Sequence, residues 1–145
     1  MQAGEVCSRE VYIVRPDEPL ADAAREMRKR HVGALVVVET RGKLTIPVGI
    51  VTDRDIVCGQ LARSADLFCL TVGDVMTRNP TLIAETESLS QAIERLSAKG
   101  VRRAPVVNDA GDLVGIVSFD DLLPAVAEDL SALARLIGTQ SRKEA

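Results

Sequence analysis

The sequence predicts a mixed α/β (α+β) fold in which two tandem copies of one β-α-β-β-α unit pack sheet to sheet about a pseudo-twofold axis. Three observations lead to this expectation. The chain of 145 residues matches itself when it is displaced by about half its length, each half alternates helical apolar stripes with short apolar runs, and one glycine-led motif occurs twice. Because a unit of about sixty residues buries little surface alone, the two units should pack together into one folded body.

The composition is that of an ordinary folded protein and excludes some partners. Hydrophobic residues make up 46% of the chain and charged residues 27%, far from the composition of disordered segments. Aromatic residues are only 2%, which argues against a binder that stacks nucleic-acid bases on exposed rings. The net charge of −3 gives no general attraction to a phosphate backbone or an anionic membrane. We therefore expect neither nucleic acid nor membrane as a partner.

Cysteine usage and the short apolar runs indicate a cytoplasmic protein. The three cysteines are odd in number and lack Cys-x-x-Cys spacing, and the single histidine cannot complete a metal cluster with them in sequence. We expect reduced thiols and no metal. The longest apolar run, Ala34 to Val38, is far shorter than the roughly twenty residues of a membrane span, and residues 1–10 are too polar for a signal peptide.

The internal repeat sets the domain organisation. A shift of 69 positions aligns Glu18 with Glu87 and Val32 with Val101, and a shift of 66 aligns Gly49 with Gly115. The change of shift places three additional residues of the first copy in the segment 40–47. We predict a first repeat at residues 7–66, a linker at 67–79, a second repeat at 80–137 with an extended C-terminal helix, and a frayed tail at 138–145.

Each copy begins with a short strand and a helix. The strands are expected at 11–14 and 81–84, where short apolar-rich segments precede a helical pattern. Apolar residues then recur at helical spacing, which predicts an amphipathic helix in each copy. These stripes are Leu20, Ala23, Ala24 and Met27 in the first copy, and Leu89, Ala92, Ile93 and Leu96 in the second.

Two strands and a second helix complete each copy. Apolar strands are expected at 34–39 and 104–108, followed by strands at 48–52 and 113–118 and by helices that open at Asp53 and Phe119. The turn at 109–112 has hairpin length, so the two strands beside it should be antiparallel. A short helix is expected between residues 62 and 79. A final stripe predicts a helix that covers the core or a partner, and with it a homodimer: Val126, Leu130, Leu133 and Ile137.

The recurring motif is Gly-Ile-Val-[Thr/Ser]-x-x-Asp, at residues 49–55 and 115–121, where a strand passes into a helix. A hydroxyl residue followed three positions later by a carboxylate is the pattern of a helix capping box. The same geometry presents backbone N–H groups at a helix N-terminus, where an anion is favoured, and a carboxylate that can accept ribose hydroxyls. The glycine should let a ligand approach the backbone. The duplication favours nucleoside binding over capping alone.

These motifs resemble those of the CBS-domain family, whose paired repeats form a Bateman module. The resemblance covers Cys7 to Leu130 and rests on both Gly-Ile-Val-[Thr/Ser]-x-x-Asp segments, on Asp74-Val75-Met76-Thr77-x-x-Pro80 and on residues 100–107. It implies that an adenosine nucleotide (AMP, ADP or ATP) binds as a regulatory ligand between the repeats, with S-adenosylmethionine or NAD as less favoured ligands and no metal required.

The resemblance also implies roles for single residues. Thr52 and Ser118 would meet phosphate or ribose oxygens, and Asp55 and Asp121 would accept the ribose hydroxyls. The adenine would lie against apolar residues of both repeats, namely Val32, Ile50, Val101 and Ile116.

One difference between the copies concerns charge. The second copy has Arg102 and Arg103 where the first has Gly33 and Ala34. Guanidinium groups suit phosphates, although a solvated surface pair is the alternative. We expect both arginines to act together with Ser118 and Asp121 in a preferred site, so that Asp121→Ala should weaken nucleotide binding more than Asp55→Ala.

These residues distinguish three possible functions. A regulatory module that binds an adenosine ligand and signals to an effector protein in trans fits best, because the repeats occupy almost the whole chain. A ligand-free dimeric interaction scaffold is the alternative, since helix capping requires the same hydroxyl and carboxylate residues. An enzyme is not expected, because the sequence lacks a catalytic constellation, a metal cluster and a phosphate-binding glycine-lysine loop.

Overall fold

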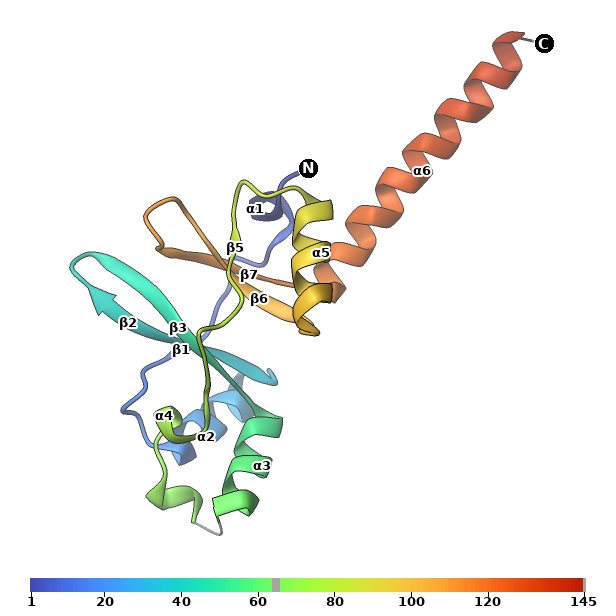
Figure 1. The fold of residues 1–145 in the computed structure, drawn as a ribbon. Helices are drawn as coiled ribbons and strands as arrows, with labels where there is room; N and C mark the ends of the chain where they lie inside the picture. Colours follow the sequence, from blue (N-terminus) through green and yellow to red (C-terminus); the bar gives the residue numbers. More distant parts are fainter. Residues whose placement is uncertain (64–65, 145) are drawn as a thin grey trace.

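The computed structural model describes residues 1–63 and 66–144, and it confirms the predicted class of fold. Figure 1 shows two lobes, one for each repeat, and a long helix that projects from the second. The first repeat comprises β1 (Ile13–Val14), α2 (Leu20–Arg30), β2 (Ala34–Arg41), β3 (Leu44–Thr52) and α3 (Asp53–Arg63). The second comprises β5 (Ile83–Ala84), α5 (Leu89–Lys99), β6 (Arg103–Val107), β7 (Leu113–Ser118) and α6 (Phe119–Glu144). The remaining elements are α1 (Ala3–Val6), the 3₁₀ helix η1 (Leu67–Cys69), α4 (Val72–Val75) and β4 (Thr77–Arg78).

The two sheets have matching topologies. One has the strand order β1-β2-β3-β4 and the other β5-β6-β7. In each sheet the first strand is parallel to the second, and the second and third form an antiparallel hairpin as expected. The first strands are shorter than the four residues predicted. The additional residues of the first copy lengthen the hairpin arms, because β2 runs to Arg41 and β3 begins at Leu44.

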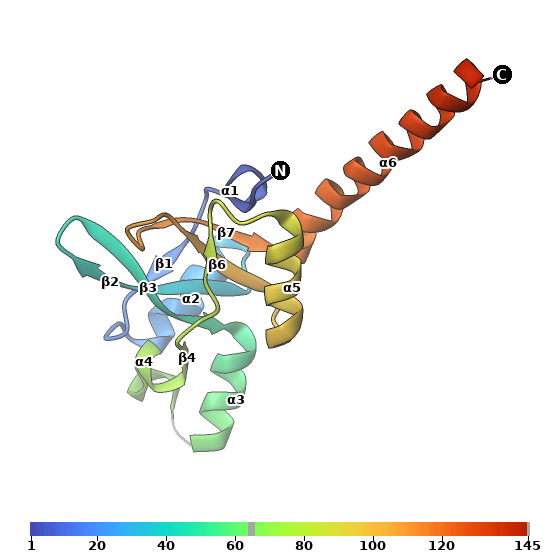
Figure 2. The same cartoon turned by 45° about the horizontal axis from the view of Figure 1, so that its top comes forward.

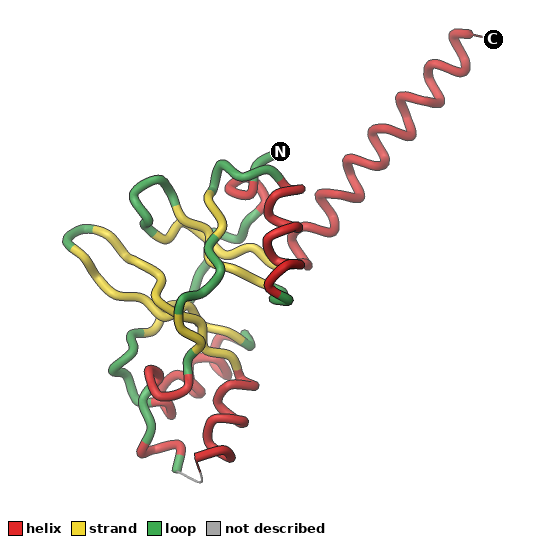
Figure 3. The backbone as a smooth tube through the Cα atoms, viewed as in Figure 1, coloured by secondary structure: helices red, strands yellow, loops and turns green. Residues whose placement is uncertain are grey.

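Each sheet is covered by helices on one face and meets the other sheet on its opposite face. Leu35 and Val37 of β2 join a core with the predicted stripe of α2. Val36 and Val38 are also buried, and because side chains alternate along a strand they point to the other face of the sheet. The same holds for β6, where Ala104 and Val106 lie in the helix-side core of the second repeat. Figure 3 shows the yellow strands of both repeats meeting in the middle of the body.

A short helix precedes each repeat, α1 before the first and α4 before the second, and we call these the leader helices. Each leader helix packs on the other repeat. The amide of Ala3 donates to the carbonyl of Glu87 at 2.8 Å, so α1 lies on the second repeat. In the same way the amide of Val72 donates to the carbonyl of Glu18 at 3.0 Å, so α4 lies on the first. Ala3 belongs to the second core and Val72 to the first. The segment expected as a linker therefore contributes to a core, and the repeats interlock.

Helix α6 leaves the body after its first turns, as the views in Figures 1 and 2 agree. The sequence placed its end at residue 137, followed by a frayed tail, whereas the helix continues to Glu144. The side chains of Leu130 and Leu133 are 62% and 54% exposed. The C-terminal stripe thus does not cover the core of its own chain.

Candidate functional site

Two cavities lie between the repeats, each beside one strand-to-helix junction. The larger has a volume of about 630 Å³ and contains the junction of β3 and α3, and we call it the Thr52 cavity. The smaller, about 280 Å³, contains the junction of β7 and α6, and we call it the Ser118 cavity. Ligand pockets typically measure about 300–1,000 Å³, so the Thr52 cavity is within that range and the Ser118 cavity is near its lower limit.

Every site residue predicted from the sequence lines one of these cavities, but their grouping differs from the expectation. The Thr52 cavity is lined by Ile50, Thr52 and Asp55 of the first repeat and by Val101, Arg102 and Arg103 of the second. The Ser118 cavity is lined by Ile116, Ser118 and Asp121 of the second repeat, by Val32 of the first, and again by Arg103.

The expected site that joined Arg102 to Ser118 and Asp121 is therefore wrong. Each cavity combines the strand-to-helix junction of one repeat with residues that follow the first helix of the other. The backbone of Arg102 does lie beside the start of α6, where its carbonyl accepts from the amide of Phe119 at 3.0 Å. Arg102 nevertheless lines the Thr52 cavity and not the Ser118 cavity. Among the residues that the structure describes, Arg103 alone lines both cavities.

The first junction forms a complete capping box. The amide of Thr52 donates to Oδ2 of Asp55 at 3.0 Å, and the amide of Asp55 donates to Oγ1 of Thr52 at 3.1 Å. Within the part of the chain that the structure describes, no protein donor bonds to Oδ1 of Asp55. Capping and ligand binding are therefore compatible, because this oxygen can accept hydroxyls from a ligand.

The second junction is a variant of the first. Both the amide and the hydroxyl of Ser118 donate to Oδ2 of Asp121, at 3.0 and 3.1 Å. The serine hydroxyl thus uses its proton on the carboxylate, whereas the Thr52 hydroxyl accepts from an amide and keeps its proton for another acceptor. The two junctions consequently offer a ligand different hydrogen-bonding groups.

The motif glycines serve the fold, which corrects the expectation that they admit a ligand. A Cβ atom on Gly49 would lie 2.7 Å from the carbonyl oxygen of Thr77, and one on Gly115 would lie 2.6 Å from Sγ of Cys7. These contacts come from the leader segments that cross β3 and β7. Burial raises the pKa of the Cys7 thiol, so this group stays neutral where it touches β7.

The two cavities have opposite charge balances. The Thr52 cavity contains the cations Arg54, Lys99, Arg102 and Arg103 against the carboxylates of Asp53 and Asp55. In the described part of the chain, the Ser118 cavity contains one cation, Arg103, against Glu10, Asp120 and Asp121. A phosphate group is therefore favoured in the Thr52 cavity and disfavoured in the Ser118 cavity.

Sequence reasoning missed several residues of the Thr52 cavity. Lys99 ends α5, and Thr77, Asn79 and Thr81 come from the segment after α4. The shift of 69 relates this segment to residues 8–12, of which all but Arg9 line the Ser118 cavity. Extending the internal repeat upstream of the first strand would have found both segments.

Across residues 1–63 and 66–144, no group of three or more His, Cys, Asp or Glu side chains is placed to hold a metal ion. Over the same residues, no helix has both the length and the apolar character that crossing a bilayer would require.

Two proteins of similar sequence come from archaea. The chain is 31% identical over 123 residues to an uncharacterized protein of Methanopyrus kandleri, which covers 85% of this chain and 61% of that protein. It is 32% identical over 122 residues to the inosine-5′-monophosphate dehydrogenase of Methanocaldococcus jannaschii, covering 84% of this chain but only 23% of the enzyme. The chain thus spans about three fifths of the first relative and a minor part of the enzyme.

Similar solved structures share the fold across most of the chain. A CBS-domain protein of unknown function from Thermoplasma acidophilum gives a TM-score of 0.76 at 25% identity, covering 86% of this chain and 68% of that one. CBSX2 in complex with AMP, a protein of Arabidopsis thaliana, gives 0.73 at 25% identity, with 88% and 96% covered. The CBS domain pair of MJ0100, in complex with 5′-methylthioadenosine and S-adenosylmethionine, gives 0.73 at 25% identity, with 87% and 99% covered.

The family model for the CBS domain matches the chain twice. The matched residues are 3–59 and 72–128, so that each match begins at one leader helix and includes one strand-to-helix junction. The two matches together account for most of the chain. The protein therefore belongs to the CBS-domain family, with two CBS domains in tandem.

Proposed function

We propose that this protein is a cytoplasmic regulatory module that binds a phosphorylated adenosine ligand of the AMP, ADP or ATP class in the Thr52 cavity and signals to an effector protein in trans. The observation that carries the proposal is that the Thr52 cavity contains four cationic residues, Arg54 within the Thr52–Asp55 junction and Lys99, Arg102 and Arg103 from the second repeat. Charge-assisted bonds from guanidinium to phosphate are among the stronger polar contacts. The proposal is for binding and regulation, not for catalysis.

The lining residues divide between the parts of such a ligand. Arg102, Arg103 and Lys99 supply the positive charge that phosphates require, together with the N-terminus of α3. Oδ1 of Asp55 accepts the ribose hydroxyls, since Oδ2 is already bonded to the amide of Thr52. Ile50 and Val101, one from each repeat, provide apolar walls for the adenine.

Proteins of similar structure support an adenosine-containing ligand. CBSX2 has been solved with AMP, and the MJ0100 domain pair with 5′-methylthioadenosine and S-adenosylmethionine. S-Adenosylmethionine carries no phosphate to pair with the cations of the Thr52 cavity, so we expect it to bind less tightly than the adenylates. NAD requires space for a second nucleoside, so we also expect it to bind less tightly than the adenylates.

Calorimetry with AMP and adenosine tests the phosphate role. We expect wild-type protein to bind AMP more tightly than adenosine, and Arg102→Ala to reduce this preference by about 1.5–3 kcal/mol, the range for hydrogen bonds to charged groups. Arg28→Ala is the matched control, because Arg28 is an exposed arginine of α2 that lines neither cavity. Equal affinity of the wild type for AMP and adenosine would remove the phosphate from the proposal.

A ligand-free dimeric scaffold is the second candidate, and one observation favours it. Apolar side chains are exposed on the helices that follow both junctions, including Val57 and Leu61 of α3 and Leu123 and Leu130 of α6. We propose that these faces pair in a homodimer whichever candidate is correct. A thermal-shift panel separates the two, since a ligand that binds only the folded state raises its stability. The scaffold takes precedence if AMP, ADP, ATP, NAD and S-adenosylmethionine all fail to bind at millimolar concentration.

A further inference from the structure

We propose that the Ser118 cavity binds an unphosphorylated nucleoside while the Thr52 cavity holds a phosphorylated one, because the carboxylates of the Ser118 cavity oppose a phosphate once Arg103 is bonded to the ligand of the Thr52 cavity. The inference rests on the proposed function of the Thr52 cavity and assigns a different class of ligand to its pseudo-symmetric counterpart. Three features of the Ser118 cavity support it: its charge, the position of Arg103 and its size.

The charge of the Ser118 cavity opposes a phosphate. Glu10, Asp120 and Asp121 all line it. A phosphate placed there would meet three carboxylates and lose part of its hydration, with a single guanidinium to compensate. A neutral nucleoside has no such cost, and its ribose hydroxyls can donate to Oδ1 of Asp121, because the two protein donors at this residue both use Oδ2.

Arg103 cannot serve both cavities at once. Its Cα is paired with that of Ser118 across β6 and β7, which places its side chain on the face of the sheet that Ser118 shares. The residue is half-buried and lines both cavities, and within the described part of the chain its side chain forms no ion pair or hydrogen bond. A phosphate in the Thr52 cavity offers this guanidinium a bidentate partner. Once Arg103 binds that phosphate, the other charged residues that the structure describes in the Ser118 cavity are all carboxylates.

The size and walls of the Ser118 cavity suit a smaller and less polar ligand. Its volume of about 280 Å³ is less than half the 630 Å³ of the Thr52 cavity. Its walls include Tyr12 and four aliphatic side chains, Val11, Val32, Val36 and Ile116. A base and a ribose can use such walls, whereas a phosphate chain gains nothing from them.

Sequential calorimetric titration tests the division directly. AMP titrated into the wild-type chain should give one equivalent per chain, and further AMP should give no second event. Adenosine titrated into the AMP-saturated protein should then give a second equivalent. Both ligands share the adenosine group, so a difference between them reports the phosphate alone.

Variants assign the two events to the two cavities. Asp121→Ala should weaken the adenosine event about tenfold or more, the effect of losing a hydrogen bond to a charged group, and leave the AMP event within about twofold. Asp120→Lys, at an exposed position that lines only the Ser118 cavity, should allow a second equivalent of AMP. Arg103→Ala should weaken the binding of AMP. It should leave the affinity of the AMP-saturated protein for adenosine within about twofold, because the guanidinium binds the phosphate in the Thr52 cavity and not the adenosine.

The outcomes separate this inference from the proposed function. Two AMP equivalents of similar affinity in the wild type, or no adenosine event in the AMP-saturated protein, would overturn the division of ligands and leave nucleotide binding in the Thr52 cavity intact. Failure of AMP to bind at all would overturn both. One AMP followed by one adenosine, with the second lost in Asp121→Ala, is the expected result.

Discussion

Gly49 shows at the scale of one residue how a motif can be required by the fold. A Cβ atom there would lie 2.7 Å from the Thr77 carbonyl oxygen and 2.9 Å from Sδ of Met76. We predict that Gly49→Ala destabilises the protein by about 1–3 kcal/mol, the range for overpacked interiors. Urea denaturation measures this. Gly138→Ala is the control, because its Cβ would meet no atom within 4 Å. A Gly49→Ala protein of wild-type stability with lost nucleotide affinity would restore the idea that the glycine admits a ligand.

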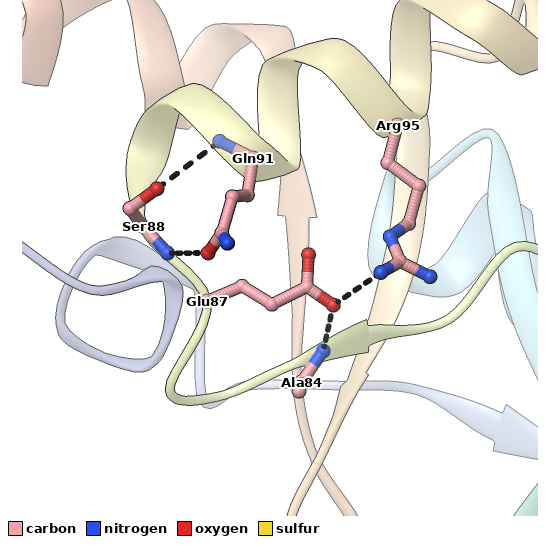
Figure 4. Close-up of polar contacts among 5 residues, drawn as sticks. All are labelled: Ala84, Glu87, Ser88, Gln91 and Arg95. Atoms are coloured by element: carbon pink, nitrogen blue, oxygen red, sulfur yellow. Dashed lines mark hydrogen bonds and ion pairs between the residues drawn. The ribbon is translucent and has the colours of Figure 1, made fainter.

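The carboxylate of Glu87 stabilises the turn before α5 by bonding through one of its two oxygens (Figure 4). Its Oε1 accepts from the amide of Ala84 at 3.1 Å and lies 3.0 Å from the Arg95 guanidinium, whereas its Oε2 is buried and has no hydrogen-bond partner among the described residues. Next to it, Ser88 and Gln91 form the capping box of α5. The side chain is 13% exposed, so the amide of Ala84 depends on this bond.

Two substitutions of Glu87 should therefore differ. Glu87→Ala leaves the Ala84 amide without its acceptor and should cost about 1–3 kcal/mol of unfolding free energy. Glu87→Gln keeps a carbonyl oxygen for that amide and removes a buried charge, so it should cost less. Chemical denaturation of both variants gives the order. A glutamine variant as unstable as the alanine variant would show that the ion pair with Arg95, and not the backbone bond, is the main contribution.

The residues that the sequence singled out line the two cavities, but they are grouped differently from the expectation. Thr52 and Asp55 could be found because a duplicated motif is visible in a linear sequence. That Arg102 would face Thr52 could not, because a repeat shows which residues are equivalent and not which repeat supplies the opposite wall. The asymmetry between Arg102–Arg103 and Gly33–Ala34 was visible, and the structure changes the cavity that it affects.

Among the elements, the short helix α4 has a pH-dependent cap. Thr71 and Asp74 form a capping box, and the hydrogen bond from the Thr71 amide, 2.8 Å long, holds the pKa of Asp74 below its usual value. A carboxyl with a lower pKa in the folded state contributes stability above its unfolded pKa and loses it as pH falls through the folded pKa.

Asp74→Asn should consequently be less stable than wild type at neutral pH, and the difference should shrink on acidification between about pH 5 and pH 2, where paired carboxylates are protonated. Urea midpoints of both proteins across this range measure the effect. Asp17→Asn, at an exposed carboxylate outside any helix, controls for the change of net charge. A stability difference that stays constant with pH would mean that Asp74 acts through its shape alone.

The projecting helix α6 makes a prediction about assembly. Its exposed side chains Leu130, Leu133 and Ile137 share one stripe, with spacings typical of helices that pair. Leu130→Glu together with Leu133→Glu should convert a dimer into a monomer in light scattering. Ser131→Glu, an exposed position off the stripe, should leave the mass unchanged. A wild-type monomer at micromolar concentration would contradict the proposed homodimer.

Elements were predicted in the right order, and their ends were not. The helical stripes of α2 and α5 identified both helices because a buried face imposes a strict period. The arms of the first hairpin extend into a segment expected as a loop, since the mutual pairing of Arg41 and Leu44 continues the ladder beyond the apolar run. An apolar run in the sequence indicates a buried strand, and this end of the hairpin is exposed or half-buried, so its strands have no apolar pattern to reveal them.

At the scale of the whole molecule, an approximate twofold arrangement produces two cavities that are related in construction and different in charge. Each leader helix packs on the opposite repeat, so neither repeat has a complete core by itself. The sequence indicated the repeats, but the exchange of leader helices could not be predicted, because it depends on contacts between segments far apart in the chain. That exchange brings residues 8–12 and 77–81 to the cavities.

The measurement that tests the central claim most directly is calorimetry of AMP with Asp55→Ala and Asp121→Ala. The two carboxylates are equivalent by the internal repeat, so each variant is the control for the other. We predict that Asp55→Ala weakens AMP binding by about 1.5–3 kcal/mol, the range for a lost hydrogen bond to a charged group, and that Asp121→Ala binds AMP nearly as the wild type does. Weaker AMP binding by Asp121→Ala than by Asp55→Ala would place the nucleotide in the Ser118 cavity and contradict the account.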